Sequence, residues 1–321
     1  MGIPKLNSYL KQNCSKNSID KKHLSLFTGK TIVIDSSIYL YKFAATNTII
    51  QSIYQMIQTF KLYNIKPIFI FDGKPPDEKK ELIYMRNDLK NEATLKCIEL
   101  QNEYDILFNK LNKTDHDMKL MNVLMDNIEK ARRQTLRVTW TDTEKVKKLL
   151  KLCDIDFYIA EGEADKLCVQ FVLNNNAWAC MSDDMDMFVY GCTRVLRGLS
   201  LYNHTVTYYN INEILRELDL KITDFRKISI LSGTDYNIEQ NVNIKDIISV
   251  YNIYKQSDNN LDFYEWYSKL NNININIDKL NRIYEMFCID ITDTIPKIDY
   301  SLKKSITIES FLRPYGFVFT S

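Results

Sequence analysis

The chain has 321 residues, 45% of them hydrophobic, which is enough to bury a sizeable core in one large domain or two small ones. Its 42 basic and 41 acidic residues leave a net charge of +1, so a nucleic-acid-binding surface would need its positive charge gathered on one face. The sequence has no run of 18 apolar residues and no apolar leader, so we expect neither a membrane span nor a secretory signal.

Four short apolar runs in the first part of the chain predict buried strands, and acidic residues follow each of them. The runs are residues 31–34, 68–71, 156–159 and 178–181. Helical patterns separate the runs, which predicts an α/β fold with a mainly parallel central sheet flanked by helices. Ligands of open parallel sheets bind at the carboxyl ends of the strands, so the acids are expected to meet in one pocket.

Two further regions have helical patterns. In residues 77–139, Leu120, Val123, Leu124 and Ile128 recur at helical spacing, and basic residues lie at both ends. After Asp235 the chain becomes helical and rich in asparagine. We therefore predict a core of residues 1–235, with a helical insertion at about 77–139, and a helical part of residues 236–321 that packs on it.

The acidic residues are candidates for metal ligands. They are Asp35, Asp72, Glu163, Asp165, Asp184, Asp186 and Asp235. Taken singly, each could be a helix cap or a turn residue. Two bare carboxylates about 4 Å apart repel by roughly 4 kcal/mol at an effective dielectric constant of 20, so a cluster of them requires cations. Mg²⁺ prefers oxygen ligands, and a pair of these ions suits phosphodiester hydrolysis.

The motifs around these acids resemble the flap endonuclease/XPG family of structure-specific 5′ nucleases. The resemblance covers roughly residues 1–245. Its most specific element is Phe-Asp-Gly-Lys-Pro-Pro at residues 71–76, and the others are residues 1–6, 33–41, 160–165, 184–191 and 233–236. The family resemblance implies a nuclease core with a helical arch, and a C-terminal region related to a helix-turn-helix that grips duplex DNA.

The resemblance also implies roles for single residues. Asp35, Asp72, Glu163 and Asp165 would mainly serve one Mg²⁺, and Asp184, Asp186 and Asp235 would lie nearer a second, with Mn²⁺ as a substitute. Lys79 and Arg86, which lie 7 and 14 positions after Asp72, would be catalytic. The expected DNA-binding residues are Gly2, Tyr41, Lys80, Lys90, Arg132, Arg133, Arg137, Asn241 and Asn243.

The sequence departs from the family pattern at three places. The interval from Asp35 to Asp72 is short, and the segment between Arg86 and Arg137 is long. The Gly-x-Gly turn that follows the last acid is missing, and Asn241-Val242-Asn243 stands there, which puts K⁺ binding in doubt; asparagine tolerates a left-handed backbone. Residues 305–312 resemble a sliding-clamp peptide without its glutamine, the alternative being a packed terminal strand or helix.

We expect a 5′ nuclease that cuts DNA at a 5′ flap, a nick or a single-stranded 5′ end, in replication, repair or recombination. Seven scattered cysteines and three histidines favour free thiols in a reducing compartment, the nucleus or a viral replication compartment, over a structural zinc site. The alternatives are a 5′→3′ exoribonuclease, a Holliday-junction resolvase and a non-catalytic DNA-binding scaffold. Mutual repulsion among unneutralised acids argues against the scaffold.

Overall fold

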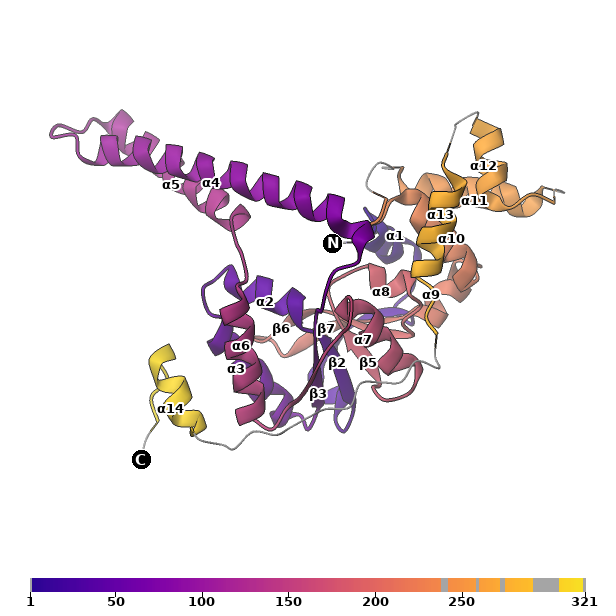
Figure 1. Cartoon of the computed structure of the whole chain (residues 1–321), viewed down its shortest axis with the longest axis horizontal. Helices are drawn as coiled ribbons and strands as arrows, with labels where there is room; N and C mark the ends of the chain where they lie inside the picture. The colour runs from indigo at the N-terminus through magenta and orange to yellow at the C-terminus, as the bar shows by residue number, and fades with distance from the viewer. Residues whose placement is uncertain (1, 238–241, 258–259, 272–274, 291–305, 320–321) are drawn as a thin grey trace.

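The computed structural model describes residues 2–237, 242–257, 260–271, 275–290 and 306–319 (Figure 1). A seven-stranded sheet with the strand order β1-β7-β6-β5-β2-β3-β4 lies at its centre. The strands from β6 to β4 are parallel, and β7 and β1 add an antiparallel edge. The strand bounds are β1 Ile19–His23, β2 Thr31–Asp35, β3 Lys66–Phe71, β4 Asp156–Ile159, β5 Ala179–Met181, β6 Arg194–Ser200 and β7 Thr205–Asn210. The prediction of a mainly parallel α/β fold is confirmed.

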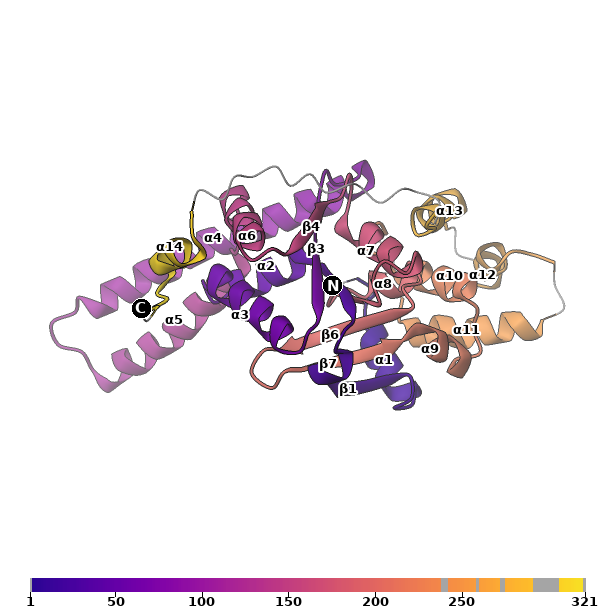
Figure 2. The same ribbon diagram turned by 90° about the horizontal axis from the view of Figure 1, so that it is seen from below.

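Helices cover both faces of the sheet, because successive side chains of a strand point to opposite faces. In β2, Val33 packs into one buried cluster, whereas Ile32 and Ile34 pack into the other. The cluster of Ile32 and Ile34 lies under η1 Leu24–Phe27, α2 Ser36–Ala44, α3 Ile49–Leu62 and α6 Trp140–Leu152. The cluster of Val33 lies under α1 Leu6–Asn13, α7 Ala164–Leu173, α8 Asp186–Val189, α9 Ile211–Glu217 and α10 Ile222–Ser232 (Figure 2).

The strand register aligns the carboxyl ends of the central strands. Asp35 at the end of β2 pairs with Ile70 of β3, and Phe71 pairs with Ile159 of β4. The loops that follow these strands therefore leave the sheet at the same edge, as the sequence predicted.

A helical hairpin projects from the core (Figures 1 and 2). It consists of α4 Lys80–Phe108, preceded by the short η2 Asp77–Lys79, and α5 Asp115–Gln134. The buried residues of α5 follow the alternating spacing of four and three residues that is typical of a coiled coil. They are Asp117, Met121, Leu124, Ile128 and Ala131.

The sequence predicted a wider apolar face for α5 than the structure has. Leu124 and Ile128 are buried, but Leu120 and Val123 are 39% and 54% exposed. The reason is that α5 packs chiefly on α4, and one partner helix covers only the narrow seam of a two-stranded coiled coil.

Replacing Ile128 in this seam by aspartate should separate α5 from α4, because an unpaired carboxylate would be buried between the two helices. We expect rapid proteolysis within residues 93–131 in the Ile128→Asp variant, while the melting temperature of the core changes little. Met125→Asp is the matched control, since Met125 is 45% exposed on the same helix. Equal protease resistance of the two variants would contradict the seam.

Three helices beyond residue 243 extend the core on the α10 side. They are α11 Ile244–Gln256, α12 Phe263–Asn271 and α13 Ile277–Met286. Ile247 of α11, Phe263 of α12 and Leu280 of α13 belong to the same buried cluster as Phe225 of α10. The division of the chain at residue 235 stays a prediction, because buried side chains are shared across it.

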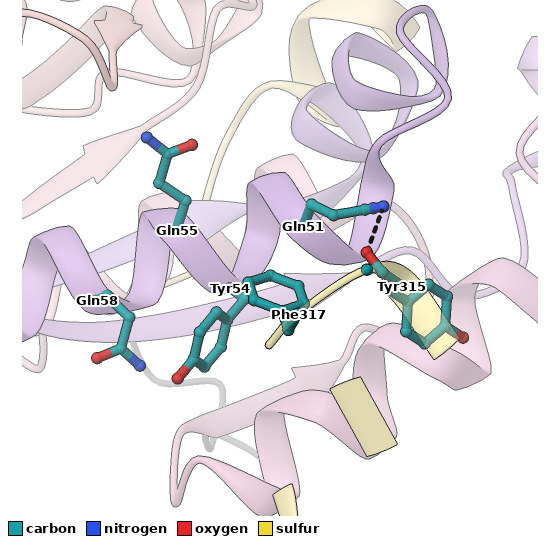
Figure 3. A pocket seen from close by; sticks show the side chains of 7 residues that line it. Gln51, Tyr54, Gln55, Gln58, Tyr315 and Phe317 are labelled. Atoms are coloured by element: carbon teal, nitrogen blue, oxygen red, sulfur yellow. Dashed lines mark hydrogen bonds between the residues drawn. The ribbon is translucent and has the colours of Figure 1, made fainter. Parts of the chain in front are cut away.

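The last described residues lie on the opposite side, against α3 and α6. α14 Ile308–Leu312 and η3 Arg313–Tyr315 place Leu312 in the core with no exposed surface. The rings of Tyr54 and Phe317 meet edge to face at 5.2 Å, and Gln51 Nε2 donates to the Tyr315 carbonyl at 3.2 Å beside an open cavity of about 420 Å³ (Figure 3). Residues 308–312 thus form the packed terminal helix that was the alternative to a clamp peptide; Ser305 lies outside the described residues.

In the part of the chain that the structure describes, no helix combines the length and the apolar character needed to cross a bilayer.

Candidate active site

The acidic residues that the sequence singled out lie together at the carboxyl edge of the sheet. Asp35 ends β2, and Asp72 directly follows β3. Glu163 and Asp165 stand at the start of α7, Asp184 and Asp186 follow β5, and Asp235 follows α10. Asp35, Asp184 and Asp186 are buried, with 3%, 6% and 2% exposure, whereas Asp72 is exposed. The cluster is therefore a cup with a buried floor and an open rim.

Three of these carboxyl groups have raised pKa values, partly because of the charges of the other acids. Burial, together with the charges of Asp72 and Asp184, raises the pKa of Asp35 to about 7. Burial and the charges of Asp35 and Asp184 raise the pKa of Asp165 well above its usual range. Burial likewise raises the pKa of Asp186, with further contributions from Asp184, Asp235 and Glu163. Such shifts arise where bare carboxylates are held together without enough compensating charge.

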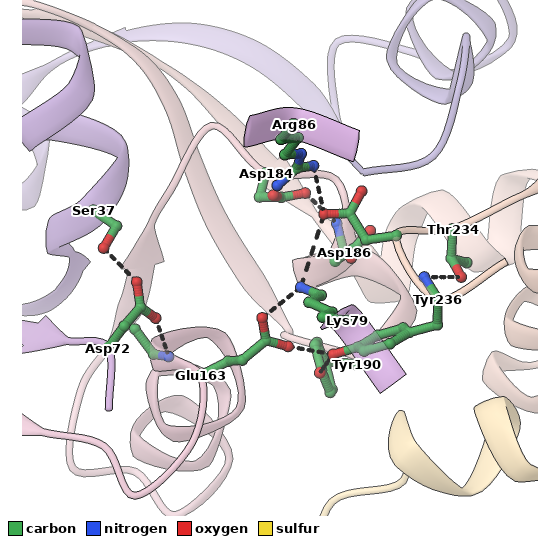
Figure 4. A network of polar contacts seen from close by, with 12 residues as sticks. Ser37, Asp72, Lys79, Arg86, Glu163, Asp184, Asp186, Tyr190, Thr234 and Tyr236 are labelled. Carbon is green, nitrogen blue, oxygen red and sulfur yellow. Dashed lines mark hydrogen bonds and ion pairs between the residues drawn. The ribbon is translucent and has the colours of Figure 1, made fainter. Parts of the chain in front are cut away.

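Two serines and one main-chain amide hold the carboxylates on the β2 and β3 side. Ser182 Oγ donates to Asp35 Oδ2 at 2.8 Å. Ser37 donates to Asp72 Oδ2, as Figure 4 shows. The amide of Ala164, in the first turn of α7, donates to Asp72 Oδ1 at 2.7 Å. The partial positive charge of a helix N-terminus suits this carboxylate.

Two basic side chains from the base of the hairpin reach into the cup (Figure 4). Lys79 is buried, and its Nζ lies 2.5 Å from Glu163 Oε1 and 3.8 Å from Asp235 Oδ2. Arg86 Nη2 lies 2.9 Å from Asp235 Oδ2. Burial alone would lower the pKa of Lys79, but Glu163 and the other carboxylates outweigh it and raise the pKa to about 12. Both residues named as catalytic therefore lie at the acids.

The chemistry of the donor set fits divalent cations. All seven predicted ligands are carboxylates, which Mg²⁺ and Mn²⁺ accept. Asp186 Oδ1 is buried and has no hydrogen-bond partner, which leaves an acceptor for a cation. Among the described residues, no three histidine, cysteine, aspartate or glutamate side chains are already arranged to hold a metal ion. Instead, Lys79 and Arg86 neutralise Glu163 and Asp235.

Some predicted DNA-binding residues gather near the cup. Tyr41 of α2 is 45% exposed, and Lys90 Nζ lies 5.3 Å from the centre of its ring. Burial and the charges of Arg137 and Arg86 lower the pKa of Lys90, so three cations lie close together here. Arg137 Nη2 also donates to Asn91 Oδ1 at 2.9 Å and so joins the end of the hairpin to α4.

The remaining basic residues have local partners. Lys80 pairs with Asp77 at 3.0 Å, Arg133 pairs with Glu129 at 3.9 Å, and Arg132 Nη2 donates to Gln101 at 3.1 Å. All three are exposed, and exposed contacts of this kind hold a side chain only weakly. They form no part of the cup.

The expected Asn241–Asn243 turn is only partly described. Asn241 lies outside the described residues. Asn243 has φ −65° and caps α11 by accepting a hydrogen bond from the amide of Lys245 at 3.3 Å. The left-handed backbone considered for it is therefore wrong at Asn243, because an asparagine that precedes a helix is favoured as its N-cap.

Gly2 packs against the floor of the cup. Its φ is +73°, and a Cβ there would come within 2.4 Å of Asp184 Oδ1 and 2.5 Å of Asp186 Oδ1. A residue that the sequence suggested as a DNA contact is thus a close neighbour of two candidate ligands. The main chain at the N-terminus can lie there only because glycine has no side chain.

We expect Gly2→Ala to lower Mn²⁺ affinity and any metal-dependent activity by at least tenfold, because the added methyl group would push both aspartates aside. Isothermal titration with Mn²⁺ measures the effect. Gly29→Ala is the matched control, since Gly29 has a similar φ of +77° and nothing within 4 Å of its Cβ position. Equal Mn²⁺ affinity of the two variants would refute the steric argument.

The hydroxyl groups that contact the carboxylates were not predicted from the sequence. Ser37, Ser182 and Tyr236 each donate to one of the seven acids, and Tyr190 contacts Tyr236. Ser37 lies two residues after the end of β2, and Ser182 directly follows β5. A small hydroxyl residue close to a strand end was therefore the signal in the sequence. Tyr236 directly follows Asp235, but nothing in the sequence shows that it reaches Glu163.

Comparison with known proteins gives consistent matches. Residues 1–93 match the family model of the XPG N-terminal domain, and residues 154–235 match that of the XPG I-region. Flap endonuclease 1-A of Oryza sativa subsp. japonica is 30% identical over 255 residues, which cover 74% of this chain and 62% of the rice protein. Flap endonuclease 1 of Methanococcus aeolicus is 30% identical over 243 residues, which cover 69% of this chain and 68% of that protein.

A solved structure extends the likeness to the fold. The catalytic core of Rad2 in complex with DNA substrate has a TM-score of 0.64 and 19% sequence identity, with coverage of 98% of this chain and 95% of that one. At this identity the likeness concerns the fold alone. The chain spans about 62% of the length of the rice relative.

Proposed function

The chain belongs to the XPG and flap endonuclease family, and on that premise we propose that it is a divalent-metal-dependent 5′ nuclease that hydrolyses DNA phosphodiesters. One observation carries the proposal: seven carboxylates and two basic side chains, brought from six separate stretches of sequence, converge at one edge of the sheet. Metal-assisted hydrolysis of a phosphodiester uses such a combination of acidic ligands and phosphate-binding cations.

The residues divide by their place in the cup. Asp35, Asp72, Glu163 and Asp165 would mainly hold one Mg²⁺, and Asp184, Asp186 and Asp235 would lie nearer a second. When bound, the two ions would supply an activated water and stabilise charge on the attacking and leaving oxygens. Lys79 and Arg86 would leave Glu163 and Asp235 and bind the scissile phosphate, where they stabilise its developing charge.

The path of the DNA follows the positive side chains at the base of the hairpin. Tyr41 is exposed and offers a ring on which a base near the cut can stack. Lys90 lies over that ring, and Arg86 and Arg137 lie near Lys90. Stacking and phosphate contacts are tolerant of sequence, which suits an enzyme that recognises structure. Residues 1–235 would form the catalytic core, and the helices α11 to α13 that follow it would hold the duplex.

The expected substrate is DNA with a 5′ flap, a nick or a single-stranded 5′ end, in replication, repair or recombination. Seven free cysteines suit a reducing compartment such as the nucleus or a viral replication compartment. Binding of a sliding clamp through residues 305–312 would require Leu312 to leave the core. We therefore propose DNA as the partner and give that segment a structural role.

Cleavage of end-labelled substrates tests the proposal. The panel contains 5′-flap DNA, nicked DNA, a four-way DNA junction and single-stranded RNA, each with Mg²⁺ and with EDTA. We expect Mg²⁺-dependent cutting of the flap, no cutting in EDTA, and steep loss of DNA binding as salt rises. The Asp184→Asn variant should bind the flap but not cut it.

Three results would contradict the proposal. Preferential cutting of the RNA would favour the exoribonuclease, and preferential cutting of the junction would favour the resolvase. Undiminished cutting by Asp184→Asn would refute the assignment of the site.

A further inference from the structure

Tyr236 stands between the candidate metal ligands and the C-terminal helices. We propose that Tyr236 is a positioning residue, which fixes the Glu163 carboxylate through its hydroxyl and seats the Lys79 ammonium on its ring. The effect expected on cleavage rests on the proposed function, whereas the effect expected on metal affinity can be measured without it.

The two oxygens of Glu163 have different partners (Figure 4). Oε1 lies 2.5 Å from Lys79 Nζ, and Oε2 accepts a hydrogen bond from the Tyr236 hydroxyl. An ammonium on a flexible side chain can move away when a metal or a phosphate arrives. The tyrosine hydroxyl belongs to a rigid ring that is only 7% exposed, so it remains to hold the carboxylate. Groups that orient a ligand in this way raise metal affinity.

The ring of Tyr236 also contacts Lys79. Lys79 Nζ lies 4.8 Å from the ring centre, within the range of a cation–π contact. One residue therefore defines the place of the candidate ligand and of the candidate phosphate-binding cation. Its neighbour Asp235 is held by the same turn, in which the Tyr236 amide donates to Thr234 Oγ1 at 3.2 Å.

Two further aromatic residues, Phe287 and Tyr190, contact Tyr236. Phe287, directly after α13, packs its ring on Tyr236 at 5.5 Å and on Tyr190 at 4.7 Å, and the two tyrosine hydroxyls lie 3.4 Å apart. The C-terminal helices thereby reach Glu163 through two contacts.

The Tyr236 hydroxyl donates to Glu163 Oε2 and lies 3.4 Å from the Tyr190 hydroxyl. Its bond to the carboxylate oxygen restrains the orientation of Glu163. A phenylalanine would keep the ring and lose only this bond.

The test compares Tyr236→Phe with the wild type, and Mn²⁺ alone is the probe in isothermal titration. We expect the Mn²⁺ affinity of the stronger site to fall about 10- to 100-fold, the range for loss of a group that orients a ligand. The Mg²⁺ concentration needed for half-maximal flap cleavage should rise in parallel, and the maximal rate should partly recover at high Mg²⁺. Flap binding in EDTA should not change.

Tyr264→Phe is the matched control. Tyr264 is also buried, but its hydroxyl donates to the main-chain carbonyl of Lys227 at 3.3 Å, so its loss should leave Mn²⁺ affinity and Mg²⁺ dependence unchanged. A double-mutant cycle adds a measurement that does not depend on cleavage: once Glu163→Gln is present, Tyr236→Phe should have no further effect on Mn²⁺ affinity.

Wild-type Mn²⁺ affinity in Tyr236→Phe, or additive effects of Tyr236→Phe and Glu163→Gln, would overturn the inference. Failure of the wild type to cut any substrate would refute the proposed function, whereas the Mn²⁺ titrations would still decide the role of Tyr236.

Discussion

Replacing Asp186 by asparagine should abolish metal-dependent cleavage and, without metal, make the protein more stable. Loss of one ligand from a metal site removes several kcal/mol of transition-state stabilisation, which corresponds to a fall of about 10³-fold in rate. In EDTA, the same change removes a buried charge that lies beside Asp184, Asp235 and Glu163. The melting temperature should rise by about 2–4 °C for each kcal/mol of relieved repulsion.

Titration with Mg²⁺ distinguishes this explanation from ordinary stabilisation. The wild type should gain melting temperature as Mg²⁺ is added, and Asp186→Asn should gain much less, so the order of the two curves should reverse. Asp126→Asn is a control, because Asp126 is exposed on the hairpin. A lower melting temperature of Asp186→Asn in EDTA would show that the aspartate stabilises the fold and would contradict the repulsion.

The pH dependence of the metal-free wild type gives a second check on this repulsion. The pKa of Asp35 is about 7 in the folded protein and near its ordinary value of 3.8 when unfolded. Between these values the folded state binds more protons, so the free energy of unfolding should rise as the pH falls from 8 to 5.5. Asp186→Asn removes another carboxyl group whose pKa is raised by burial and by Asp184, and it should therefore flatten this slope.

The sequence predicted the sheet and its acidic edge well, because both depend on local patterns. A β-branched run such as residues 31–34 is typical of a buried strand, and parallel strands end at one edge whatever lies between them. The position of Asp35 and Asp184 in one cluster followed from that rule. The burial gradient from Asp186 to Asp72 did not, because it depends on which loops and helices close over the edge.

The sequence was less informative where contacts join distant segments of the chain. The sequence predicted that Leu120 and Leu124 share one apolar face. The spacing along α5 cannot show that its partner helix α4 buries only a narrow seam of that face. Tyr236 was missed for the same kind of reason: its hydroxyl partner lies 73 residues away at Glu163. Asn243 was expected in a left-handed turn, but its side chain satisfies the first turn of α11 instead.

Replacing Lys79 by methionine should have two opposite effects. Cleavage should fall by about 10²–10³-fold, the usual loss when a group that stabilises transition-state charge is removed. Mn²⁺ affinity should rise several-fold, because the ammonium no longer competes for Glu163 and Asp235, and Tyr236 still holds Glu163. In EDTA the free energy of unfolding should fall by about 3 kcal/mol, since two partly buried carboxylates lose their counter-charge.

Lys80→Met separates these effects from the general loss of a positive charge. Lys80 is the next residue along the chain, but its ion pair with Asp77 at 3.0 Å lies in solvent, where such pairs contribute little. Its Mn²⁺ affinity should therefore match the wild type, and its cleavage rate at saturating DNA should fall far less than that of Lys79→Met. If Lys79→Met instead weakened Mn²⁺ binding, the lysine would be organising the acids, and the competition between ammonium and metal would be wrong. A rise in affinity together with a loss of cleavage would show that the cation leaves the carboxylates to act on the phosphate.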